Sequence, residues 1–469
     1  MISNVIPVTV VSIADLEKDV LREDLMNNLK GSFTGDVAYK YNWKFLQPVK
    51  EESAIFSELK SLFEIDSSLD SLESHRIKGH LFIYLVPENS YIGASNRITF
   101  GSSRFAYISV KSNEYEIEER SLAELIVDTV EVMLQPKNSE KSQLFNKDNH
   151  NDINNMQFLL NNEIDILINI ITEDVNEAND FQESSKLSEI KNLTNIAFLK
   201  QSGIFQLLDV KITTQMLYFA LTPRFIESNL FVSPADANAR LFKTSNVPLF
   251  LNAIESRIVE HNNKQSYYLT VYIPSNGSSP LTFYDESTKM KSNAFVTPYR
   301  GGVMVWNNEE DFNIGFKTFM RCLIGLPIKE NSNTLIKNNY FAKWELDSII
   351  RNVALLQLSK TLSSLESIEK LLGKVSNIVI LEEIAGKMHQ AVDLAHESID
   401  CLAKGDLHEA FQLSSKAYQA SETAFFDPSL LALLYFPDDQ KYAVYFPLFL
   451  PVSLPLMASI HHIIRSLKK

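Results

Sequence analysis

The stretch YAVYFPLFLPVSLPLMASIHHII, residues Tyr442–Ile464, decides what kind of chain this is. It has no formally charged residue apart from its histidines, and 11 of its residues are Leu, Ile, Val or Phe. As a helix it would be about 35 Å long, which is enough to cross a hydrocarbon core of roughly 30 Å. Two interpretations follow, a membrane span or the last helix of a soluble core.

Three prolines, Pro447, Pro451 and Pro455, decide between these interpretations. Inside a helix in water each proline costs about 3 kcal/mol, and three would remove much of a domain's stability of about 5–15 kcal/mol. A membrane helix tolerates proline where neighbouring helices, water or local unwinding satisfy the freed carbonyls. We therefore predict a transmembrane helix at 441–465 rather than a buried helix or hairpin-like insertion, and the four-residue spacing predicts that the proline stripe faces a partner helix.

The charges that flank the span predict its orientation. Arg465, Lys468 and Lys469 follow it, whereas Asp438 and Asp439 precede it. Because positively charged flanks stay on the cytoplasmic side, the tail at 466–469 is expected to be cytoplasmic and the large body lumenal.

Composition excludes two further classes of protein. The net charge of −14 and the absence of a basic cluster argue against nucleic-acid binding. Two cysteines exclude a scaffold built on disulfides. The sequons at Asn192 and Asn276 are possible N-glycosylation sites if the body is lumenal.

The body of the chain alternates between strand-like and helix-like segments, which predicts an α/β layer around a sheet. We expect its first part at 1–135, an exposed polar loop at 136–156 and its second part at 157–343. Gly301 and Gly302 are able to supply a turn or bulge between strands. The expected strands are 5–13, 36–46, 80–88, 104–112, 266–275 and 294–308, and the expected helices are 15–29, 51–72 and 122–134.

Residues 344–440 are predicted to form a helical hairpin or small bundle that acts as a stalk. Apolar residues follow a spacing of three and four in two stretches. Gly405 suits a helix C-cap, and Asp406 with Glu409 forms a capping-box pattern that opens the next helix. The apolar positions are Ile349, Val353, Leu356, Leu362, Leu365, Ile368 and Leu372, then Ile384, Met388, Ala391, Ala395, Ile399 and Leu402.

The arrangement most similar to a metal site is His389, Asp393 and His396, which share one helical face. The simpler interpretation is a solvated polar face. We expect no metal and no cofactor.

A catalytic nucleophile is not expected either. Cys322 and Cys401 occur in apolar surroundings that suit inert thiols. His461 and His462 near the end of the span could mark a functional site, but interfacial placement beside Arg465 is the simpler interpretation.

Several long segments resemble the PIG-S family, subunits of the GPI transamidase complex. The resemblance is dense from about residue 265 onward and thin between about 20 and 200. Its segments are PVTVV (Pro7–Val11), NAFVTPYRGGVMVWN (Asn293–Asn307), LLGKVSNIVILEEIA (Leu371–Ala385) and SETAFFDPSLLALLYFPDDQKYAVYFPLFLPVSLPL (Ser421–Leu456).

The resemblance implies a non-catalytic subunit in the endoplasmic-reticulum membrane that scaffolds the attachment of GPI anchors to precursor proteins. It implies as partners the caspase-like subunit PIG-K, which carries the catalytic Cys and His, together with PIG-T, PIG-U and a GAA-type subunit. GPI lipid and precursor protein would be held nearby, and the family offers no catalytic residue to carry over.

The family also has an N-terminal membrane helix, and this sequence begins where such a helix would already have ended. Either the sequence is a fragment or the usual translocation signal is lacking. Two alternative functions therefore stay open: a tail-anchored cytosolic adaptor, and a membrane-anchored metal-dependent hydrolase that uses His389, Asp393 and His396.

Overall fold

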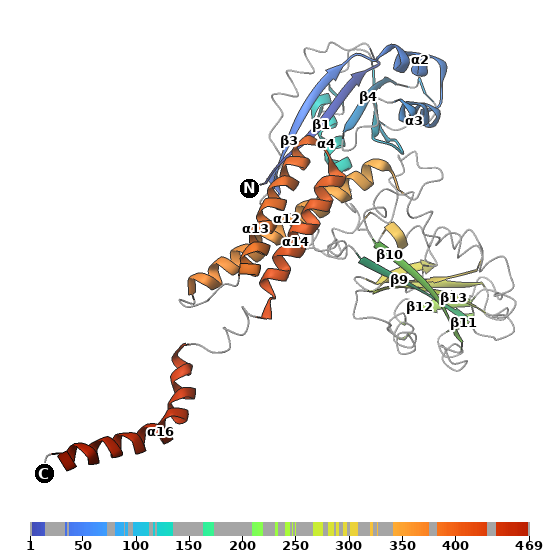
Figure 1. The fold of residues 1–469 in the computed structure, drawn as a ribbon. Coiled ribbons are helices and arrows are strands. Elements are labelled where there is room, and N and C mark those ends of the chain that lie inside the picture. Colours follow the sequence, from blue (N-terminus) through green and yellow to red (C-terminus); the bar gives the residue numbers. More distant parts are fainter. Residues whose placement is uncertain are drawn as a thin grey trace. The chain divides into compact units, whose positions relative to one another are not determined.

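The computed structural model describes a set of helices, strands and connecting residues (Figure 1). Its contacts divide the chain into two compact units, Met1–Leu356 with Ser398–Ser415, and Gln357–Glu397 with Lys416–Lys469. The described residues are 2–14, 33–34, 37–72, 80–88, 90–91, 97–111, 116–117, 120–134, 163–172, 209–218, 230–232, 240–243, 246, 249, 266–274, 280–285, 288–289, 294–297, 301–307, 319–321, 326, 341–374, 382–428 and 438–467.

The first unit begins with a six-stranded sheet of order β2-β3-β1-β4-β6-β5. Strands β3, β1, β4 and β6 are parallel, and the edge strands β2 and β5 are antiparallel to their neighbours. In this register Val8 lies between Trp43 and Leu81. The bounds are β1 Ile2–Ser12, β2 Phe33–Thr34, β3 Val37–Leu46, β4 Leu81–Pro87, β5 Ile98–Phe100 and β6 Phe105–Val110.

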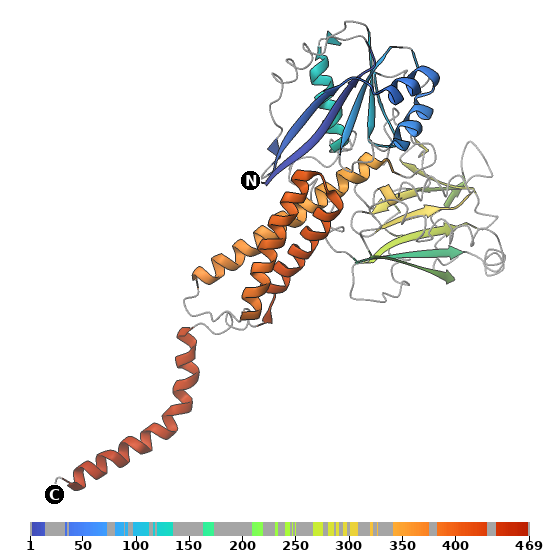
Figure 2. The ribbon, with the colours of Figure 1, turned by 45° about the horizontal axis from the view of Figure 1, so that its top comes forward.

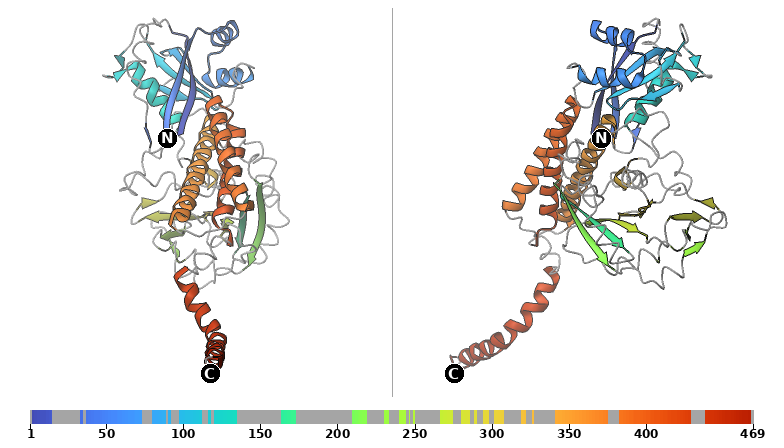
Figure 3. Two further views of the ribbon diagram at one scale, coloured as in Figure 1. Left: turned by 60° about the vertical axis from the view of Figure 1, so that its left-hand side comes forward. Right: turned by 90° about the vertical axis from the view of Figure 1, so that its right-hand side faces the viewer.

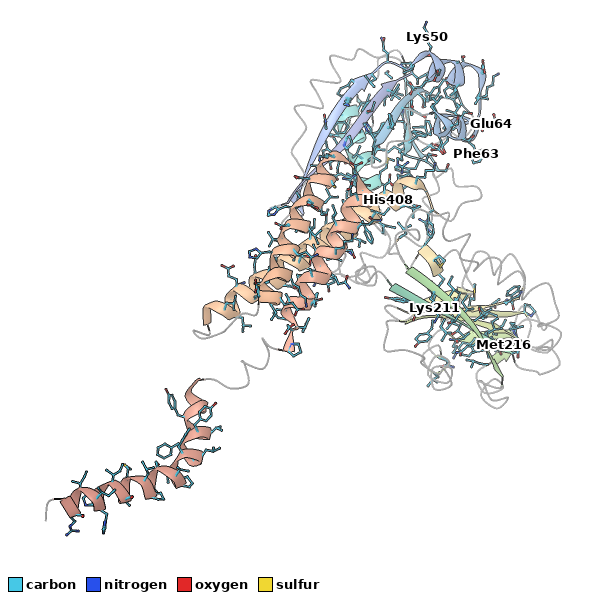
Figure 4. The ribbon with its side chains drawn as sticks, viewed as in Figure 1. Lys50, Phe63, Glu64, Lys211, Met216 and His408 are labelled. Atoms are coloured by element: carbon cyan, nitrogen blue, oxygen red, sulfur yellow. The ribbon has the colours of Figure 1, made fainter. Side chains whose placement is uncertain are left out.

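Helices cover both faces of this sheet (Figure 2). Helices α2 (Lys50–Glu58) and α3 (Leu62–Ser71) pack on one face through Phe56, Leu62 and Ile65, while α4 (Leu122–Leu134) lies on the other. Burial on both faces explains the nearly continuous apolar sequences of β4 and β6. On α3, Phe63 and Glu64 instead point outward (Figure 4).

A second, separate sheet of order β10-β9-β13-β17-β16 lies in the same unit. Here too four strands are parallel, and an antiparallel strand, β16, pairs at the edge with the strand that follows it in sequence. The order and directions of these five strands match those of five strands of the first sheet: β10 corresponds to β3, β9 to β1, β13 to β4, β17 to β6 and β16 to β5. The predicted α/β class is therefore confirmed, but it contains two such sheets. The bounds are β9 Glu163–Thr172, β10 Asp209–Tyr218, β13 Ser266–Ile273, β16 Ala294–Thr297 and β17 Gly301–Val305.

Smaller sheets complete the described strands. The strands β11, β12, β14 and β15 form a four-stranded sheet, and β7 pairs with β8. Their bounds are β7 Glu116–Ile117, β8 Arg120–Ser121, β11 Leu230–Val232, β12 Arg240–Lys243, β14 Leu281–Asp285 and β15 Thr288–Lys289.

Three long helices follow, α12 (Lys343–Lys374), α13 (Glu382–Lys404) and α14 (Leu407–Phe425) (Figure 3). Within the second unit they share a core that contains Ile368, Ile384 and Ala424. The Ser364 hydroxyl donates a 2.7 Å hydrogen bond from α12 to Glu422 of α14. The predicted helical extension is therefore present as three helices.

The turn between α13 and α14 has the predicted cap. Gly405 has a φ of 89°, a left-handed conformation that favours glycine. The Asp406 N–H donates to the Cys401 carbonyl at 3.0 Å, the six-to-one hydrogen bond of a Schellman motif. Helix α14 then begins at Leu407.

Four sequence expectations need correction. The single helix expected at 51–72 is two helices, α2 and α3, because the backbone is extended at Leu59. The single strand expected at 294–308 is the antiparallel pair β16 and β17. Gly301 and Gly302 are the first residues of β17 and pair with both neighbouring strands, so they form no turn there. Leu362 is 45% exposed, because the six-residue step from Leu356 rotates it about 240° around the helix. The expected helix at 15–29, the polar loop at 136–156, Asn192, Asn276 and Cys322 lie outside the described residues.

Candidate membrane-spanning helix and the placement of reactive residues

Helix α16 (Asp438–Leu467) is long and apolar enough to span a membrane between Tyr442 and Ser466, a stretch of 25 residues or about 38 Å. None of the apolar segment of α16 is buried by the rest of the described chain. Phe446, Leu448 and Phe449 are each exposed by about two-thirds or more. Such exposure would strongly oppose solubility in water, whereas lipid solvates the same side chains. This exposure favours a membrane span over the buried-helix alternative.

The three prolines lie inside α16, and its ribbon bends along its length (Figures 1 and 2). Proline has no backbone N–H and its ring crowds the carbonyl four residues earlier. Pro447, Pro451 and Pro455 therefore remove the donors that a regular helix would supply to the carbonyls of Ala443, Pro447 and Pro451. We name these three carbonyls the acceptor stripe.

His461 and His462 are exposed near the C-terminal end of α16, four and three residues before Arg465. Arg465 is also in the last turn of the helix. These positions suit the membrane interface, where basic side chains extend toward water.

The three candidate zinc ligands do not form a site. His389, Asp393 and His396 are all exposed on α13. No group of three or more His, Cys, Asp or Glu side chains that could hold a metal occurs among the described residues. The buried side of the same helix consists of Ile384, Ala391, Ala395, Ser398 and Leu402. The placement fits the solvated polar face that the sequence offered as the simpler interpretation.

Cys401 is a free, half-buried thiol on α13. Burial raises its pKa, and the nearby Glu409 raises it further. A raised pKa reduces the thiolate fraction, which is the nucleophilic form. The environment of Cys401 is therefore the opposite of an activated nucleophile's.

Sequence reasoning missed the buried carboxylate of Asp66 on α3, which is 1% exposed. Its Oδ2 accepts hydrogen bonds from the Ser102 N–H at 2.9 Å and from the Ser102 hydroxyl, and the Tyr107 hydroxyl donates to Oδ1 at 3.3 Å. Burial raises the pKa of Asp66, although these hydrogen bonds partly oppose the shift. A Cβ at Gly101 would lie 2.1 Å from Oδ1, so the carboxylate depends on glycine there. The contacts hold α3 against the β5–β6 turn.

Sequence reasoning also missed an ionic anchor around the start of α12. We define the α12 anchor as Arg104 with Asp347, and Arg321 with Glu345. The Arg321 guanidinium donates to both Glu345 oxygens, at 2.6 and 3.1 Å, and Glu345 Oε2 also accepts from the Ala342 N–H at 2.9 Å.

The other pair of the anchor joins the β5–β6 turn to α12. The Arg104 guanidinium donates to both Asp347 oxygens. Burial tends to lower the pKa of Arg104, but the hydrogen bond and charge of Asp347 prevail and raise it. Trp344 adds a 3.1 Å hydrogen bond from its indole N–H to the Gly101 carbonyl. All four charges of the anchor are paired, so they position α12.

The candidate metal ligands on α13 are thus exposed, Cys401 is a half-buried thiol with a raised pKa, and the charges of the α12 anchor are paired. The apolar helix α16 has no partner within the described chain. This combination defines a protein with an α/β body, a helical extension and one C-terminal candidate membrane span. The chain belongs to the PIG-S family: the family profile, described as phosphatidylinositol-glycan biosynthesis class S protein, matches residues 5–469.

Curated relatives agree with this membership. The chain is 33% identical over 287 residues to a Mus musculus protein named GPI-anchor transamidase component PIGS, and 32% identical over 287 residues to the Homo sapiens protein of the same name. Each match covers 55% of this chain and 50% of the relative. A Schizosaccharomyces pombe protein named GPI transamidase component PIG-S homolog is 24% identical over 262 residues, 51% of this chain and 43% of that protein. The chain spans about half the length of the curated relatives it matches.

Proposed function

We propose that this chain is a non-catalytic subunit of a GPI transamidase and acts in the attachment of GPI anchors to precursor proteins. The observation that carries the proposal is the family match from residue 5 to residue 469, which includes both α/β sheets, the three-helix extension and α16. The exposure of His389, Asp393 and His396 and the raised pKa of Cys401 support a role other than catalysis.

The proposal includes the endoplasmic-reticulum membrane as the location, with the body lumenal and the C-terminal tail cytoplasmic. The family resemblance supports as partners the caspase-like PIG-K, PIG-T, PIG-U and a GAA-type subunit. The basic residues Arg465, Lys468 and Lys469 support this orientation of α16.

The physical contribution of such a subunit is proximity. Transamidation needs a peptide carbonyl, a catalytic thiol and the amine of a membrane lipid in one place. Holding reacting groups in a fixed arrangement removes much of the entropic barrier of a diffusional encounter. An α12 helix held by one buried and one partly buried ion pair supplies a fixed element on which partners can be placed.

The test of the assignment is purification of the full chain from microsomes in mild detergent, with the co-purifying proteins identified and their stoichiometry measured. We expect the caspase-like subunit to be recovered in a fixed ratio. Recovery of the chain without it would contradict the proposal. In the same preparation, stoichiometric zinc that is lost in His389→Ala would instead support the metal-dependent hydrolase.

The orientation is tested separately through the sequons. We expect glycosidase treatment to reduce the mass of the wild-type chain, and Asn192→Gln with Asn276→Gln to abolish that change. Protease added to sealed microsomes should leave the body intact. An unglycosylated body that the protease digests would indicate the cytosolic adaptor.

A further inference from the structure

The acceptor stripe raises a chemical question that the family membership does not answer. The carbonyls of Ala443, Pro447 and Pro451 each lose their helical donor. In hydrocarbon an unsatisfied carbonyl costs several kcal/mol, because neither water nor lipid tails can donate a hydrogen bond. Local unwinding of α16 can satisfy part of this need, and water or the side chains of neighbouring helices satisfy the rest.

The three carbonyls lie on one side of the helix. At about 100° per residue, a spacing of four keeps them within an arc of roughly 80°. Their depths differ: along the axis, Pro447 lies about 8 Å and Pro451 about 14 Å beyond Tyr442. Ala443 lies near the start of the span, where interfacial water can reach it. Pro451 lies near the middle of the span, where a protein donor is needed most.

Among the described residues, no side chain donates to these three carbonyls. No described residue buries the apolar segment of α16. Ser453 lies between the prolines, but its hydroxyl donates to the Leu450 carbonyl at 3.3 Å, which is not one of the three. The residues that flank the stripe, such as Val444 and Leu448, have no hydrogen-bonding side chain.

We propose that the acceptor stripe is the docking surface for a transmembrane helix of a partner subunit that carries hydroxyl or amide side chains at the depth of Pro447 and Pro451. This inference rests on the proposed function, because it takes the partner to be another subunit of the same complex. A second copy of this chain is a poorer occupant, since a parallel copy offers only Tyr442, Tyr445 and the already bonded Ser453 among the hydroxyls of this half of the span.

The inference is tested in the full chain by variants that restore a backbone N–H donor to one of the freed carbonyls, or that free a different carbonyl. Pro455→Ala returns a donor to the Pro451 carbonyl, and Pro447→Ala does so for Ala443. We expect Pro455→Ala to weaken partner association about 3-fold and up to roughly 20-fold, the range for single hydrogen bonds between membrane helices. Pro447→Ala should have the smaller effect because its carbonyl lies nearer to water.

A matched variant separates the position of the freed carbonyl from the number of prolines. Exchanging two neighbours, Pro455→Leu with Leu456→Pro, keeps the composition and the number of prolines but moves the freed carbonyl from Pro451 to Val452, about 100° around the helix. We expect this exchange to weaken association at least as much as Pro455→Ala. Phe449→Leu, on the opposite side of α16, should leave it unchanged. An exchange variant that associates like wild type would overturn the inference.

The partner is identified by photo-crosslinking from Val444 and Leu448 in detergent-purified complex, with Phe449 as the control position. We expect crosslinked peptides from a membrane helix of a co-purifying subunit that bears Ser, Thr, Asn or Gln. Replacing that residue by Ala or Val should weaken association, and its effect should not add to that of Pro455→Ala.

The possible results distinguish this inference from the proposed function. Crosslinks only to lipid, only to α16 of a second copy, or to a helix without donors would overturn the docking surface while transamidase subunits still co-purify. Crosslinks to a donor-bearing helix of an unrelated membrane protein would leave the surface in place and contradict the proposed function.

Discussion

Removing the Glu345 carboxylate is the most severe test of how the α/β unit holds α12. The Arg321 and Glu345 side chains are 3% and 5% exposed, and the pair makes two direct hydrogen bonds. Glu345→Ala leaves a buried guanidinium without its counter-charge and the Ala342 N–H without its acceptor. We expect the free energy of unfolding to fall by about 3–5 kcal/mol, the usual cost of breaking a buried pair by removing one partner.

Hydrogen-bond energies give a similar figure. A hydrogen bond to a charged group contributes roughly 1.5–3 kcal/mol, so the two bonds from Arg321 alone account for about 3–6 kcal/mol. In contrast, the ion pair of Glu366 and Lys370 on the same helix is 64% and 73% exposed. Glu366→Ala should therefore cost no more than about 0.5 kcal/mol, which makes it the matched control.

The assay is denaturant unfolding of the detergent-solubilised full chain, followed by tryptophan fluorescence. Trp344 is 2% exposed and adjacent to Glu345, so its emission reports on this part of the fold. The double variant Arg321→Met with Glu345→Leu should recover most of the loss, because an apolar pair needs no counter-charge. A Glu345→Ala cost below about 1 kcal/mol, or a double variant that loses the sum of both single variants, would refute the argument.

Three further outcomes follow from described residues. Burial raises the pKa of Asp66 above its ordinary 3.8, so the folded state binds a proton more tightly than the unfolded chain does. The free energy of unfolding of wild type, relative to that of Asp66→Asn, should therefore fall as the pH rises above about 4. Parallel pH profiles of unfolding for the two proteins would contradict this. Gly405→Ala should lower the free energy of unfolding by about 1 kcal/mol, because alanine is strained in the left-handed conformation of this residue. Gly386→Ala has open space around its Cβ and should raise the free energy of unfolding by up to about 1 kcal/mol through helix propensity. Melting temperatures measure both changes. In a Cys322→Ala background, Cys401 should react with iodoacetamide more slowly in the folded chain than in urea, by mass spectrometry, because its pKa is raised; equal rates would contradict the assignment.

Local elements were predictable from the sequence, because each has its own pattern. Helix α4 occupies the predicted residues Leu122–Leu134, and β1 at Ile2–Ser12 overlaps the predicted strand at 5–13. An amphipathic period indicates a helix and its buried face, and a run of β-branched residues indicates a buried strand. The long apolar helix α16 was predictable for the same reason, since its length and composition are local properties.

Pairings between distant residues were not predictable. Arg104 and Asp347 are 243 positions apart, and nothing near either residue indicates the other. Asp66 was hidden in a helical segment, because its burial depends on Gly101 and Ser102 of a turn 36 positions later. The division into two separate sheets depends on strand pairing, which a run of apolar residues does not specify.

That the two sheets share one strand order has a consequence for how the origin of the chain can be read. Duplication of one ancestral segment would give the same four parallel strands and the same antiparallel edge strand twice. Unrelated segments also arrive at the same order, because right-handed crossovers leave few topologies open to a parallel sheet. Superposition of the two sheets, strand on strand, with a comparison of the residues that coincide, separates these two origins.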